Sequence, residues 1–415
     1  MSNQCPNGWN STTLLDVSEK VKAGPFGSAI TKSMYVADGF KVYGQEQVIA
    51  GDISIGSYFI SEEKFEELSS FSVQEGDILM SCVGTFGKTL LVPEKHKQGI
   101  INPRLILVRL KDDFCPLFVQ YLLSSSLVQD QLLSCLGGGT MGVINATMLK
   151  RLSLRTPPLP EQKKIAEILS GIDILVSAEQ RKRLKISLMR SSTITKFTRY
   201  GLAKSLFRNT SIGKIPEDWR VCTLGEVFVR YSYGPRFSAK DYSSSGNVRT
   251  IRGTDVSAST GIRYSQVPLA KLDEKLVSSH SLSDGDVVMI TTADCGLTSV
   301  FREQEIPFIC SAYAVRFTPG KMINPDYFAL FMQSELALRQ VDSFTRKGTV
   351  ANLPGSDVMK IKLPLPGIDE QNKIVQIIRS IDHQIKFIDN QIDSHKSLQK
   401  SLSTDLLSGR KRVSI

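Results

Sequence analysis

The stretch Pro157-Pro-Leu-Pro-Glu-Gln-Lys-Lys-Ile-Ala-Glu-Ile-Leu-Ser-Gly-Ile-Asp173 decides the fold, because the chain repeats it as Pro364-Leu-Pro-Gly-Ile-Asp-Glu-Gln-Asn-Lys-Ile-Val-Gln-Ile-Ile-Arg-Ser-Ile-Asp382. Both copies run from prolines through Glu-Gln into an apolar pattern that ends at Ile-Asp. Proline suits the residues before a helix and its first turn, but not its interior. An acidic side chain is stabilised by the positive end of the helix dipole. The sequence therefore predicts that Glu161 and Glu370 each lie at the start of a helix.

The apolar residues of both predicted helices follow steps of four and three, which is the spacing of a coiled-coil seam. In the second helix they are Ile374, Ile378, Ile381, Ile385, Ile388 and Ile392, and in the first they are Ile165, Leu169, Ile172 and Val176, before the polar Glu179 and Arg183. At 1.5 Å per residue, each helix would be about 55 Å long. A single helix of this kind fits a globular core as well as a coiled coil. Two matched copies favour a pair, and we predict that the two helices pack antiparallel.

Length, charge and cysteine content limit the class of protein. The 415 residues suggest two or three domains, and a net charge of +10 favours a polyanionic partner such as DNA or RNA. The sequence has no run of about 18 apolar residues, so we expect no membrane span. The start Met-Ser-Asn-Gln-Cys lacks the features of a signal peptide. Seven scattered cysteines without Cys-x-x-Cys predict reduced thiols in the cytoplasm.

The repeat extends far beyond the helices. The matches are Trp9 with Trp219, Thr13-Leu14 with Thr223-Leu224, Gly24-Pro25 with Gly234-Pro235, Gly76-Asp77 with Gly285-Asp286, Gly87 with Gly296, Val108-Arg109 with Val315-Arg316, and Gly139-Thr140 with Gly348-Thr349. The spacing stays near 210 residues, so the chain is predicted to be two copies of one globular-plus-helix unit. Few other residues match, so the two surfaces should differ. The predicted domains are residues 1–156, a helical spacer at 157–203, residues 204–363 with a link at 204–214, and a second spacer at 364–415.

Each globular half has the pattern of a mixed α and β domain. Short apolar runs at Asp77–Val83, Leu105–Leu110, Asp286–Thr291 and Ala312–Phe317 predict strands, and Pro116–Leu133 and Pro325–Val341 predict helices that begin with proline. Gly137–Gly142 predicts a flexible turn. The predicted fold class is α+β, with two similar domains separated by two long helices, and a pseudo-two-fold internal repeat.

Two motifs suggest catalysis, but each has a plainer interpretation. Cys82-Val-Gly-Thr-Phe-Gly-Lys-Thr89 nearly matches a phosphate-binding loop but lacks the first glycine, so a turn whose Lys88 meets a DNA phosphate is the alternative. Asn324-Pro-Asp-Tyr327 resembles the Asn-Pro-Pro-Tyr loop of amino-methyltransferases, but also fits an Asn cap with proline at the first helical position. The four histidines show no ligand spacing, so we predict neither a metal site nor a cofactor held by this chain.

Basic and aromatic residues beside predicted turns are the candidates for nucleic-acid contact. Arginine can hydrogen bond to guanine with two N–H groups, and lysine neutralises phosphates. The predicted DNA-binding residues are Phe26, Ser28, Lys88, Arg104, Tyr233, Arg236, Arg249, Arg252, Arg346 and Lys347. A solvated basic surface is the alternative for each of them. Arg236 is the first candidate for contact with a base, because Phe26 stands at the matching position.

The duplicated Pro-Leu-Pro-Glu-Gln to Ile-Asp element, the paired Trp-x-x-x-Thr-Leu starts and the Gly-Pro loops resemble the specificity subunit of type I restriction-modification systems. The resemblance covers nearly the whole chain. It implies two target recognition domains that each bind one half of a split double-stranded DNA site. The helices would separate them and dock two modification subunits, which use S-adenosylmethionine. Restriction subunits, which use ATP and Mg, would complete the complex, and this chain would not be an enzyme. Gly367-Ile-Asp before Glu370 looks like an insertion that alters the helix start.

Two alternatives come from other classes of protein. An orphan DNA methyltransferase would need a loop that holds its cofactor, which we do not find in the sequence. A coiled-coil scaffold without DNA binding would not need the basic excess.

Overall fold

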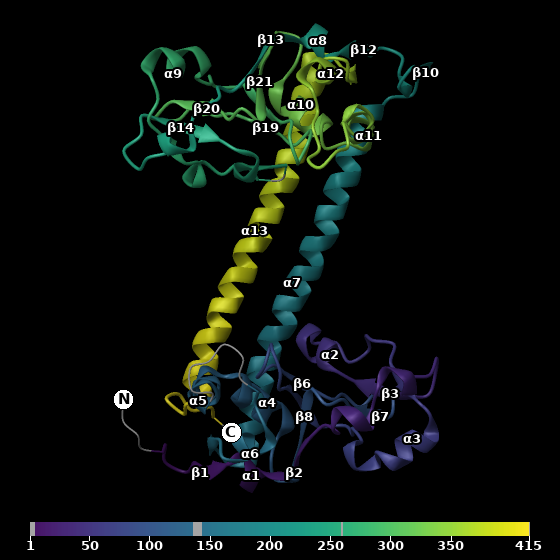
Figure 1. Cartoon of the computed structure of the whole chain (residues 1–415), viewed down its shortest axis with the longest axis vertical. Helices are drawn as coiled ribbons and strands as arrows, with labels where there is room; N and C mark the ends of the chain where they lie inside the picture. Colours follow the sequence, from purple (N-terminus) through teal and green to yellow (C-terminus); the bar gives the residue numbers. More distant parts are fainter. Residues whose placement is uncertain (1–4, 136–142, 259, 415) are drawn as a thin grey trace. The chain divides into compact units, whose positions relative to one another are not determined.

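The computed structural model describes residues 5–135, 143–258 and 260–414 (Figure 1). The predicted turn at 137–142, with the Gly139-Thr140 match, lies outside the described residues. The chain forms two compact units, residues 1–179 with 391–415, and residues 180–390. Each unit holds one globular half, at 5–156 or 207–365, and one end of each long helix. The predicted boundaries of domains and spacers stay a prediction.

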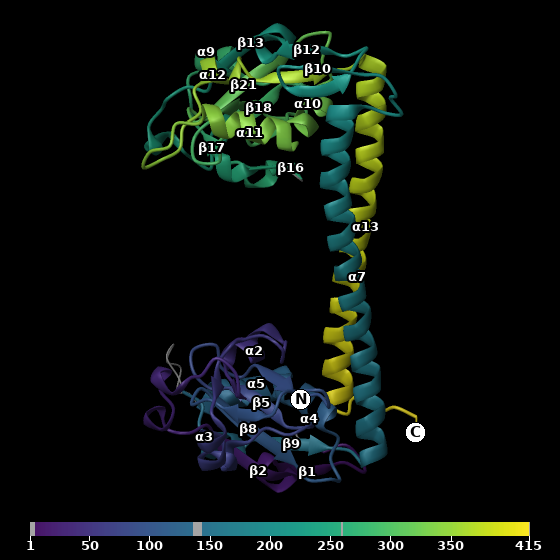
Figure 2. The same ribbon diagram turned by 90° about the vertical axis from the view of Figure 1, so that its right-hand side faces the viewer.

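The two long helices are α7 (Leu159–Tyr200) and α13 (Ile368–Leu407), and they pack together side by side (Figure 2). In the first unit, Ile165 and Leu169 at the start of α7 share a core with Leu406 at the end of α13. In the second unit, Ile194 near the end of α7 shares a core with Ile374 at the start of α13. The helices are therefore antiparallel, as predicted.

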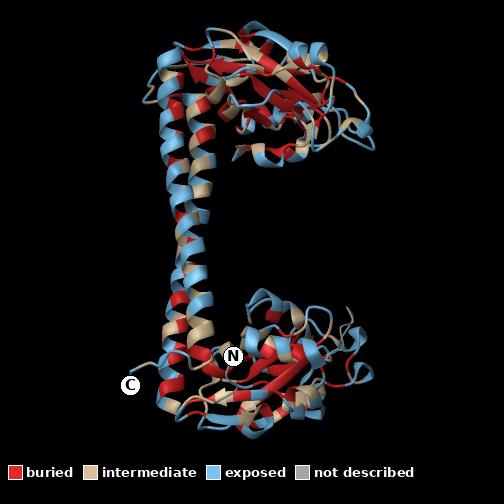
Figure 3. Ribbon diagram, turned by 90° about the vertical axis from the view of Figure 1, so that its left-hand side faces the viewer, coloured by how far each residue is buried: buried red, intermediate tan, exposed pale blue. Residues whose placement is uncertain are grey.

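The predicted seam residues are buried, but they contact more than the other helix. Ile165, Leu169, Ile172, Ile374, Ile378, Ile381 and Ile388 are buried, and Ile385 is partly buried. Ile165 and Leu169 belong to the same core as Phe118 of the first half, and Ile374 and Ile378 to the same core as Phe328 of the second. The start of each helix is therefore also a core element of its own globular half. Figure 3 shows buried residues concentrated in the strands and the adjoining helix ends.

Within its described residues, the first half contains three small sheets. In the first, β1 (Asn10–Thr13) pairs with β9 (Ser153–Thr156). The second is a four-stranded antiparallel sheet with the order β2 (Ser18–Ala23), β8 (Leu105–Leu110), β5 (Ile78–Ser81) and β6 (Thr89–Leu91). A three-stranded sheet has the order β4 (Phe59–Ile60), β3 (Phe40–Tyr43) and β7 (Gly99–Ile101), and β3 and β7 are parallel.

The second half repeats this topology. β12 (Arg220–Thr223) pairs with β22 (Lys362–Leu365), the four-stranded order is β13 (Phe228–Tyr233), β21 (Ala314–Pro319), β18 (Val287–Ile290) and β19 (Thr298–Val300), and the three-stranded order is β17 (Leu269–Ala270), β14 (Val248–Ile251) and β20 (Phe308–Cys310). β14 and β20 are parallel, like β3 and β7. The internal repeat predicted from the sequence is thus a repeat of fold. The predicted link at 204–214 carries a strand, β10 (Phe207–Thr210), which pairs with β11 (Gly213–Pro216).

Helices follow β8 and β21, the strands of the four-stranded sheets that come last along the chain. Here the sequence prediction was wrong in one respect. The single helices expected at 116–133 and 325–341 are each two helices, which are α4 (Pro116–Ser124) with α5 (Ser126–Cys135), and α10 (Pro325–Phe331) with α11 (Glu335–Phe344). Ser125 ends α4 in an extended conformation, and the Ser334 side chain caps α11 by accepting from the Ala337 N–H. Serine competes with helical hydrogen bonds through its own hydroxyl, so apolar periodicity alone could not locate either break.

The residues that match between the halves are framework residues. Asp77 and Asp286 are fully or almost fully buried, and each forms an ion pair at 2.8 Å, with Arg109 and Arg316. These arginines are not equivalent in the sheet, because Ile78 pairs with Val108 whereas Val287 pairs with Phe317. Arg316 therefore lies two positions earlier in its strand than Arg109 in its own. A shift of two residues keeps a side chain on the same face of the sheet, so Arg109 reaches Asp77 and Arg316 reaches the equivalent Asp286.

Thr13 and Thr223 match because each begins a short helix, α1 (Leu14–Val17) or α8 (Leu224–Val227). Each threonine hydroxyl and an acidic residue three positions later form a capping box, which satisfies the free N–H groups at the helix start. These matches therefore preserve the strand-to-helix turn that opens each half.

Candidate nucleic-acid interface

Three predicted residues of the first half meet at one end of its four-stranded sheet. Because the strands are antiparallel, β2 and β5 end where β8 and β6 begin. Phe26 follows β2, Arg104 precedes β8 and Lys88 precedes β6. The Cys82 N–H donates to the Arg104 carbonyl at 3.1 Å, and the Ser81 N–H donates to the Lys88 carbonyl at 2.9 Å. We call Phe26, Lys88 and Arg104, all of them exposed, the first sheet end.

Ser28 lies in a short 3-10 turn (Gly27–Ala29) just beyond Phe26, and it is also exposed. The sequence therefore identified four exposed residues of the first half that follow or precede the same strand ends. Two of the four, Lys88 and Arg104, are basic and can neutralise phosphates.

The second half brings Tyr233, Arg236 and Arg346 to the corresponding place. Arg236 follows β13, and Tyr233 is the last residue of that strand. Arg346 pairs through its backbone with Asn352, which bridges to Thr292, two residues after the end of β18. Lys347 is 72% exposed and forms an ion pair of 2.9 Å with Asp342. We call Arg236, Tyr313 and Arg346 the second sheet end, since Tyr313 directly precedes β21.

A hollow of about 900 Å³ lies beside the second sheet end. Its lining includes Arg236, Tyr242, Arg252 and Tyr313. The Arg252 guanidinium donates two hydrogen bonds of 3.0 Å to the buried Asp255, and these bonds raise the arginine pKa above its ordinary value. Its side chain is still 45% exposed, so Arg252 is both an anchor of the turn and part of the hollow.

Arg249 does not join this group. It lies in β14 of the three-stranded sheet, and its guanidinium donates to the Val267 carbonyl. Lys41 occupies the same position in β3 and donates to the Ser54 carbonyl at 2.7 Å. In both halves a basic side chain here holds a neighbouring loop, and the contact of Arg249 with DNA stays a prediction.

The two catalytic-looking motifs are structural. Cys82–Thr89 connects β5 to β6 in an antiparallel hairpin, whereas a phosphate-binding loop leads into a helix. The Asn324 side chain accepts from the Asp326 and Tyr327 N–H groups at 2.8 and 3.2 Å, which makes it the cap of α10. The Tyr327 ring is fully buried. Both segments therefore have a structural role in the fold.

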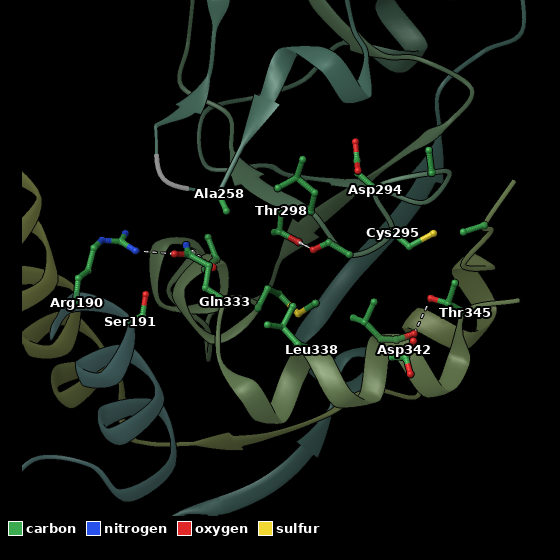
Figure 4. Close-up of a pocket in the computed structure, with 17 residues that line it drawn as sticks. Arg190, Ser191, Ala258, Asp294, Cys295, Thr298, Gln333, Leu338, Asp342 and Thr345 are labelled. Atoms are coloured by element: carbon green, nitrogen blue, oxygen red, sulfur yellow. Dashed lines mark hydrogen bonds between the residues drawn. The ribbon is translucent and has the colours of Figure 1, made fainter. Parts of the chain in front are cut away.

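A second hollow, of about 720 Å³, lies between the end of α7, α11 and the loop around Cys295 (Figure 4). Of the described residues that line it, Arg190 alone is basic, and its guanidinium already binds Gln333 and Asp382. Asp294 and Asp342 add two carboxylates. Burial raises the pKa of the Cys295 thiol, which opposes a reactive thiolate. This hollow is therefore unsuited to a polyanion.

The duplicated Glu-Gln anchors each long helix. Gln162 accepts from the Cys115 N–H and donates to the Pro157 carbonyl, both at 2.9 Å. Gln371 accepts from the Asn324 N–H at 2.8 Å and donates to the Pro366 carbonyl at 2.9 Å. The glutamine therefore binds the start of each long helix to the start of the helix that follows the four-stranded sheet.

The preceding glutamate binds the opposite helix terminus. Glu161 is buried and forms two hydrogen bonds, of 2.6 and 2.7 Å, with Arg412 after the end of α13. Glu370 accepts from the Leu202 N–H after α7 and from the Trp219 indole, both at 3.0 Å. Each Glu thus joins the beginning of one long helix to the end of the other within one unit.

The apparent insertion at Gly367-Ile-Asp is wrong as a prediction. Glu161 is the third residue of α7, and Glu370 is the third residue of α13. The glutamines bind Pro157 and Pro366, which therefore correspond, and both helices start in the same way. The sequence match had used the wrong prolines, because Pro160 inside the first turn of α7 is replaced by Asp369.

The duplicated architecture is matched by a known protein family. The family model described as type I restriction modification DNA specificity domain matches twice, at residues 6–188 and 216–394. A putative type I restriction enzyme MjaX specificity subunit of Methanocaldococcus jannaschii is 24% identical over 99% of this chain and 95% of the relative. The MjaVIII specificity subunit of the same organism is 24% identical over 82% of this chain and 80% of the relative.

Solved structures agree on the fold. A chain from work on complex assembly and conformational transition of the type I R-M system has a TM-score of 0.65 at 17% identity, over 98% of this chain and 99% of that one. The S subunit of a type I restriction-modification system from M. genitalium has a TM-score of 0.53 at 16% identity, over 98% and 97% of the two chains.

The two matched domains define a protein that confers DNA sequence specificity. The chain belongs to the family of type I restriction-modification DNA specificity domains, of which it carries two, and acts as a DNA specificity subunit of such a system.

Over the part of the chain that the structure describes, no cluster of three or more His, Cys, Asp or Glu residues could hold a metal ion. Over the same part, no helix has the length and apolar character needed to span a membrane.

Proposed function

We propose that this chain recognises a bipartite site in double-stranded DNA, with one half-site bound by each sheet end. The observation that carries the proposal is the pair of equivalent sheet ends, which share a framework but carry different exposed side chains. Two domains with different surfaces on one chain suit two different half-sequences with an unread gap between them. The basic excess supplies affinity for phosphates at any sequence.

The proposed DNA contacts of the first half are Phe26, Ser28, Lys88 and Arg104, and those of the second half are Tyr233, Arg236, Arg252, Arg346 and Lys347. Arg346 and Lys347 are 74% and 72% exposed, and their ion pairs with acidic neighbours lie at the surface. Surface ion pairs contribute little and exchange readily for a phosphate. These two residues therefore suit backbone contact better than base contact.

We further propose that the long helices dock two modification subunits, and that restriction subunits join the same assembly. Leu184 and Leu188 of α7 and Phe387 of α13 are 60%, 65% and 62% exposed. Large apolar side chains at such exposure on a helix favour a protein partner. S-adenosylmethionine, ATP and Mg would act on the partner subunits, and this chain would make and break no bond itself. The assembly would work in the cytoplasm.

Methylome sequencing of cells that carry the intact system tests the bipartite site. We expect one modified motif with two specific parts and an unspecific gap. Replacing residues 211–363 with the same region of a relative should change one part only. A change in both parts, or a motif without a gap, would contradict the proposal.

The orphan methyltransferase is tested by incubating the purified chain with DNA and labelled S-adenosylmethionine. We expect no transfer of the methyl group until the modification subunits are added. Methyl transfer by the chain alone would overturn the non-catalytic role.

A further inference from the structure

Each sheet end contains two positions whose backbone contacts have an equivalent in the other half. The Cys82 N–H donates to the Arg104 carbonyl, and the Thr291 N–H donates to the Tyr313 carbonyl at 3.0 Å. Arg104 and Tyr313 each stand immediately before the second strand of the four-stranded sheet. The Gly-Pro loops supply the other pair, Phe26 and Arg236, each two residues after the glycine.

Close backbone contact places these two positions side by side in each half. A Cβ atom on Gly24 would lie 1.9 Å from the Asn102 carbonyl oxygen, and one on Gly234 would lie 1.9 Å from the Cys310 carbonyl oxygen. The Gly24 N–H also donates to the Leu105 carbonyl, and the Gly234 N–H to the Ala314 carbonyl. Only glycine permits this approach, so the loop after the first strand and the turn before the second are fixed against each other.

The side chains at the two positions are exchanged between the halves. The first half has an aromatic ring in the loop, Phe26, and an arginine before the strand, Arg104. The second half has an arginine in the loop, Arg236, and an aromatic ring before the strand, Tyr313. Each sheet end therefore carries one guanidinium and one ring, but in opposite order.

These four side chains are available for a ligand. Phe26 is 88% exposed and Tyr313 is 64% exposed, which are high values for large rings on a well-packed domain. Among the described residues, neither the Arg104 nor the Arg236 guanidinium forms a hydrogen bond or an ion pair, unlike Arg252 and Arg346. Each fork of N–H donors is therefore free to bind an acceptor pair. Arg236 and Tyr313 also line one hollow, which holds both around a common space.

We propose that Phe26 with Arg104, and Arg236 with Tyr313, are the specificity-determining pairs of the two half-sites. In each pair the guanidinium donates two hydrogen bonds to the O6 and N7 atoms of a guanine, and the ring packs against the neighbouring base. Because the order is exchanged, the guanine and its neighbour stand in opposite order along the two half-sites relative to the domain. This inference rests on the proposed function, since it requires duplex DNA at both sheet ends.

The test is selection of bound duplexes from a randomised DNA library by the full chain in complex with its modification subunit, followed by sequencing. Arg236→Ala and Tyr313→Ala should relax preference at the same or adjacent base pairs of one half-site by about tenfold or more. Phe26→Ala and Arg104→Ala should relax the other half-site by a similar factor. In every variant the untouched half-site reports that the protein is folded.

Conservative variants separate base contact from general effects. Arg236→Lys keeps the charge but loses the fork, so it should relax preference almost as much as Arg236→Ala. Tyr313→Phe keeps the ring and should restore the preference that Tyr313→Ala loses. Lys271→Ala removes an exposed charge of the same half and should also leave it unchanged.

An unchanged motif in all four alanine variants would overturn the inference. Uniform loss of affinity without altered preference would also overturn it, because it would make these residues phosphate contacts. A wild-type complex that selects no motif at all would overturn the proposed function, and this inference with it.

Discussion

The two globular halves share their strands, their turns and their buried ion pair, yet they differ at the ends of their four-stranded sheets. Asp77 and Asp286 are both buried against an arginine, and Gly24 and Gly234 both press against a carbonyl. At positions fixed by that framework, Phe26 is replaced by Arg236 and Arg104 by Tyr313. The comparison teaches that residues which match carry the fold, and residues which differ at a fixed backbone position are those free to set specificity.

The helix starts show the same contrast in a different form. Glu161 and Glu370 have the same place in their helices, but one binds an arginine and the other binds two N–H groups and Lys204. The position of the glutamate in its helix is therefore the same in both copies, while the groups that it binds differ. Stability should depend on both glutamates, but through different forces.

The largest expected effect concerns the buried ion pairs. Asp77→Ala or Asp286→Ala would leave Arg109 or Arg316, whose side chains are 17% and 15% exposed, without their partner. Removing one member of a buried pair typically costs about 3–5 kcal/mol. We expect each variant to lower the free energy of unfolding of its own unit by that amount, measured by urea denaturation of the full chain.

The exposed Glu94 provides the matched control, because Glu94→Ala removes the same charge from the first half. It should change stability by less than about 0.5 kcal/mol. If Asp77→Ala behaves like Glu94→Ala while Asp286→Ala does not, the two frameworks are not energetically equivalent, and the comparison fails.

The sequence could predict the helices, strands and internal repeat better than the contacts between residues far apart in the chain. The strand at Leu105–Leu110 and the two long helices followed from apolar spacing, because burial imposes that spacing locally. The repeat and the antiparallel pairing followed from residues that match between the two copies. The partner of Glu161 is 251 residues away at Arg412, and no local pattern encodes such a contact. Only the fold brings the two residues together.

The correspondence of Tyr313 with Arg104 was missed, although the sequence held a signal for it. Met80 and Met289, Gly87 and Gly296, and Glu161 and Glu370 all differ by 209 in number. Adding 209 to Arg104 gives Tyr313. The matching dipeptides Val108-Arg109 and Val315-Arg316 give a different correspondence, which the sheet register shifts by two residues. A constant offset is therefore better evidence of equivalence than an identical dipeptide.

The next effect distinguishes the two helix-start glutamates. Glu161→Ala and Glu370→Ala should each lower the free energy of unfolding by about 1.5–3 kcal/mol, the usual range for hydrogen bonds to a charged group. Added salt should shrink the Glu161 effect more, because its partner Arg412 is 42% exposed and screened by solvent ions. Urea denaturation at low and high salt measures this difference.

Glu167→Ala, at an exposed pair with Lys164 on α7, is the control and should be nearly neutral. Equal salt dependence of the Glu161 and Glu370 variants would show that their partners matter less than their position.

A smaller effect is expected at the exposed helix surface of the second unit. The double variant Leu184→Asp with Leu188→Asp should leave the melting temperature unchanged, because both side chains face solvent in the free chain. It should weaken assembly with the modification subunit by about tenfold or more, since charges would enter an apolar contact. Titration calorimetry with the purified subunit measures the affinity. Lys185→Asp places the same charge on a neighbouring exposed position and should be milder. Full assembly by the double variant would move the docking surface elsewhere.

The smallest effect tests a charge that one sheet end has and the other lacks. The Ser81 N–H donates to the Lys88 carbonyl and the Ile290 N–H to the Leu297 carbonyl at 2.8 Å, so Lys88 corresponds to the neutral Leu297. Lysine is a point charge without the fork of arginine, so we expect it to contact a phosphate and not a base.

Lys88→Ala should weaken binding by a few-fold at all DNA sequences alike and reduce the slope of log affinity against log salt by about 1. Fluorescence anisotropy of the assembled complex over a salt series measures both values, with the exposed Lys95→Ala as control. A relaxed preference at one base pair would instead place Lys88 among the base contacts of the first sheet end. The difference between Lys88 and Leu297 would then add a third specificity position to the exchanged pair, because a neutral side chain and a cation at one backbone site cannot favour the same base edge.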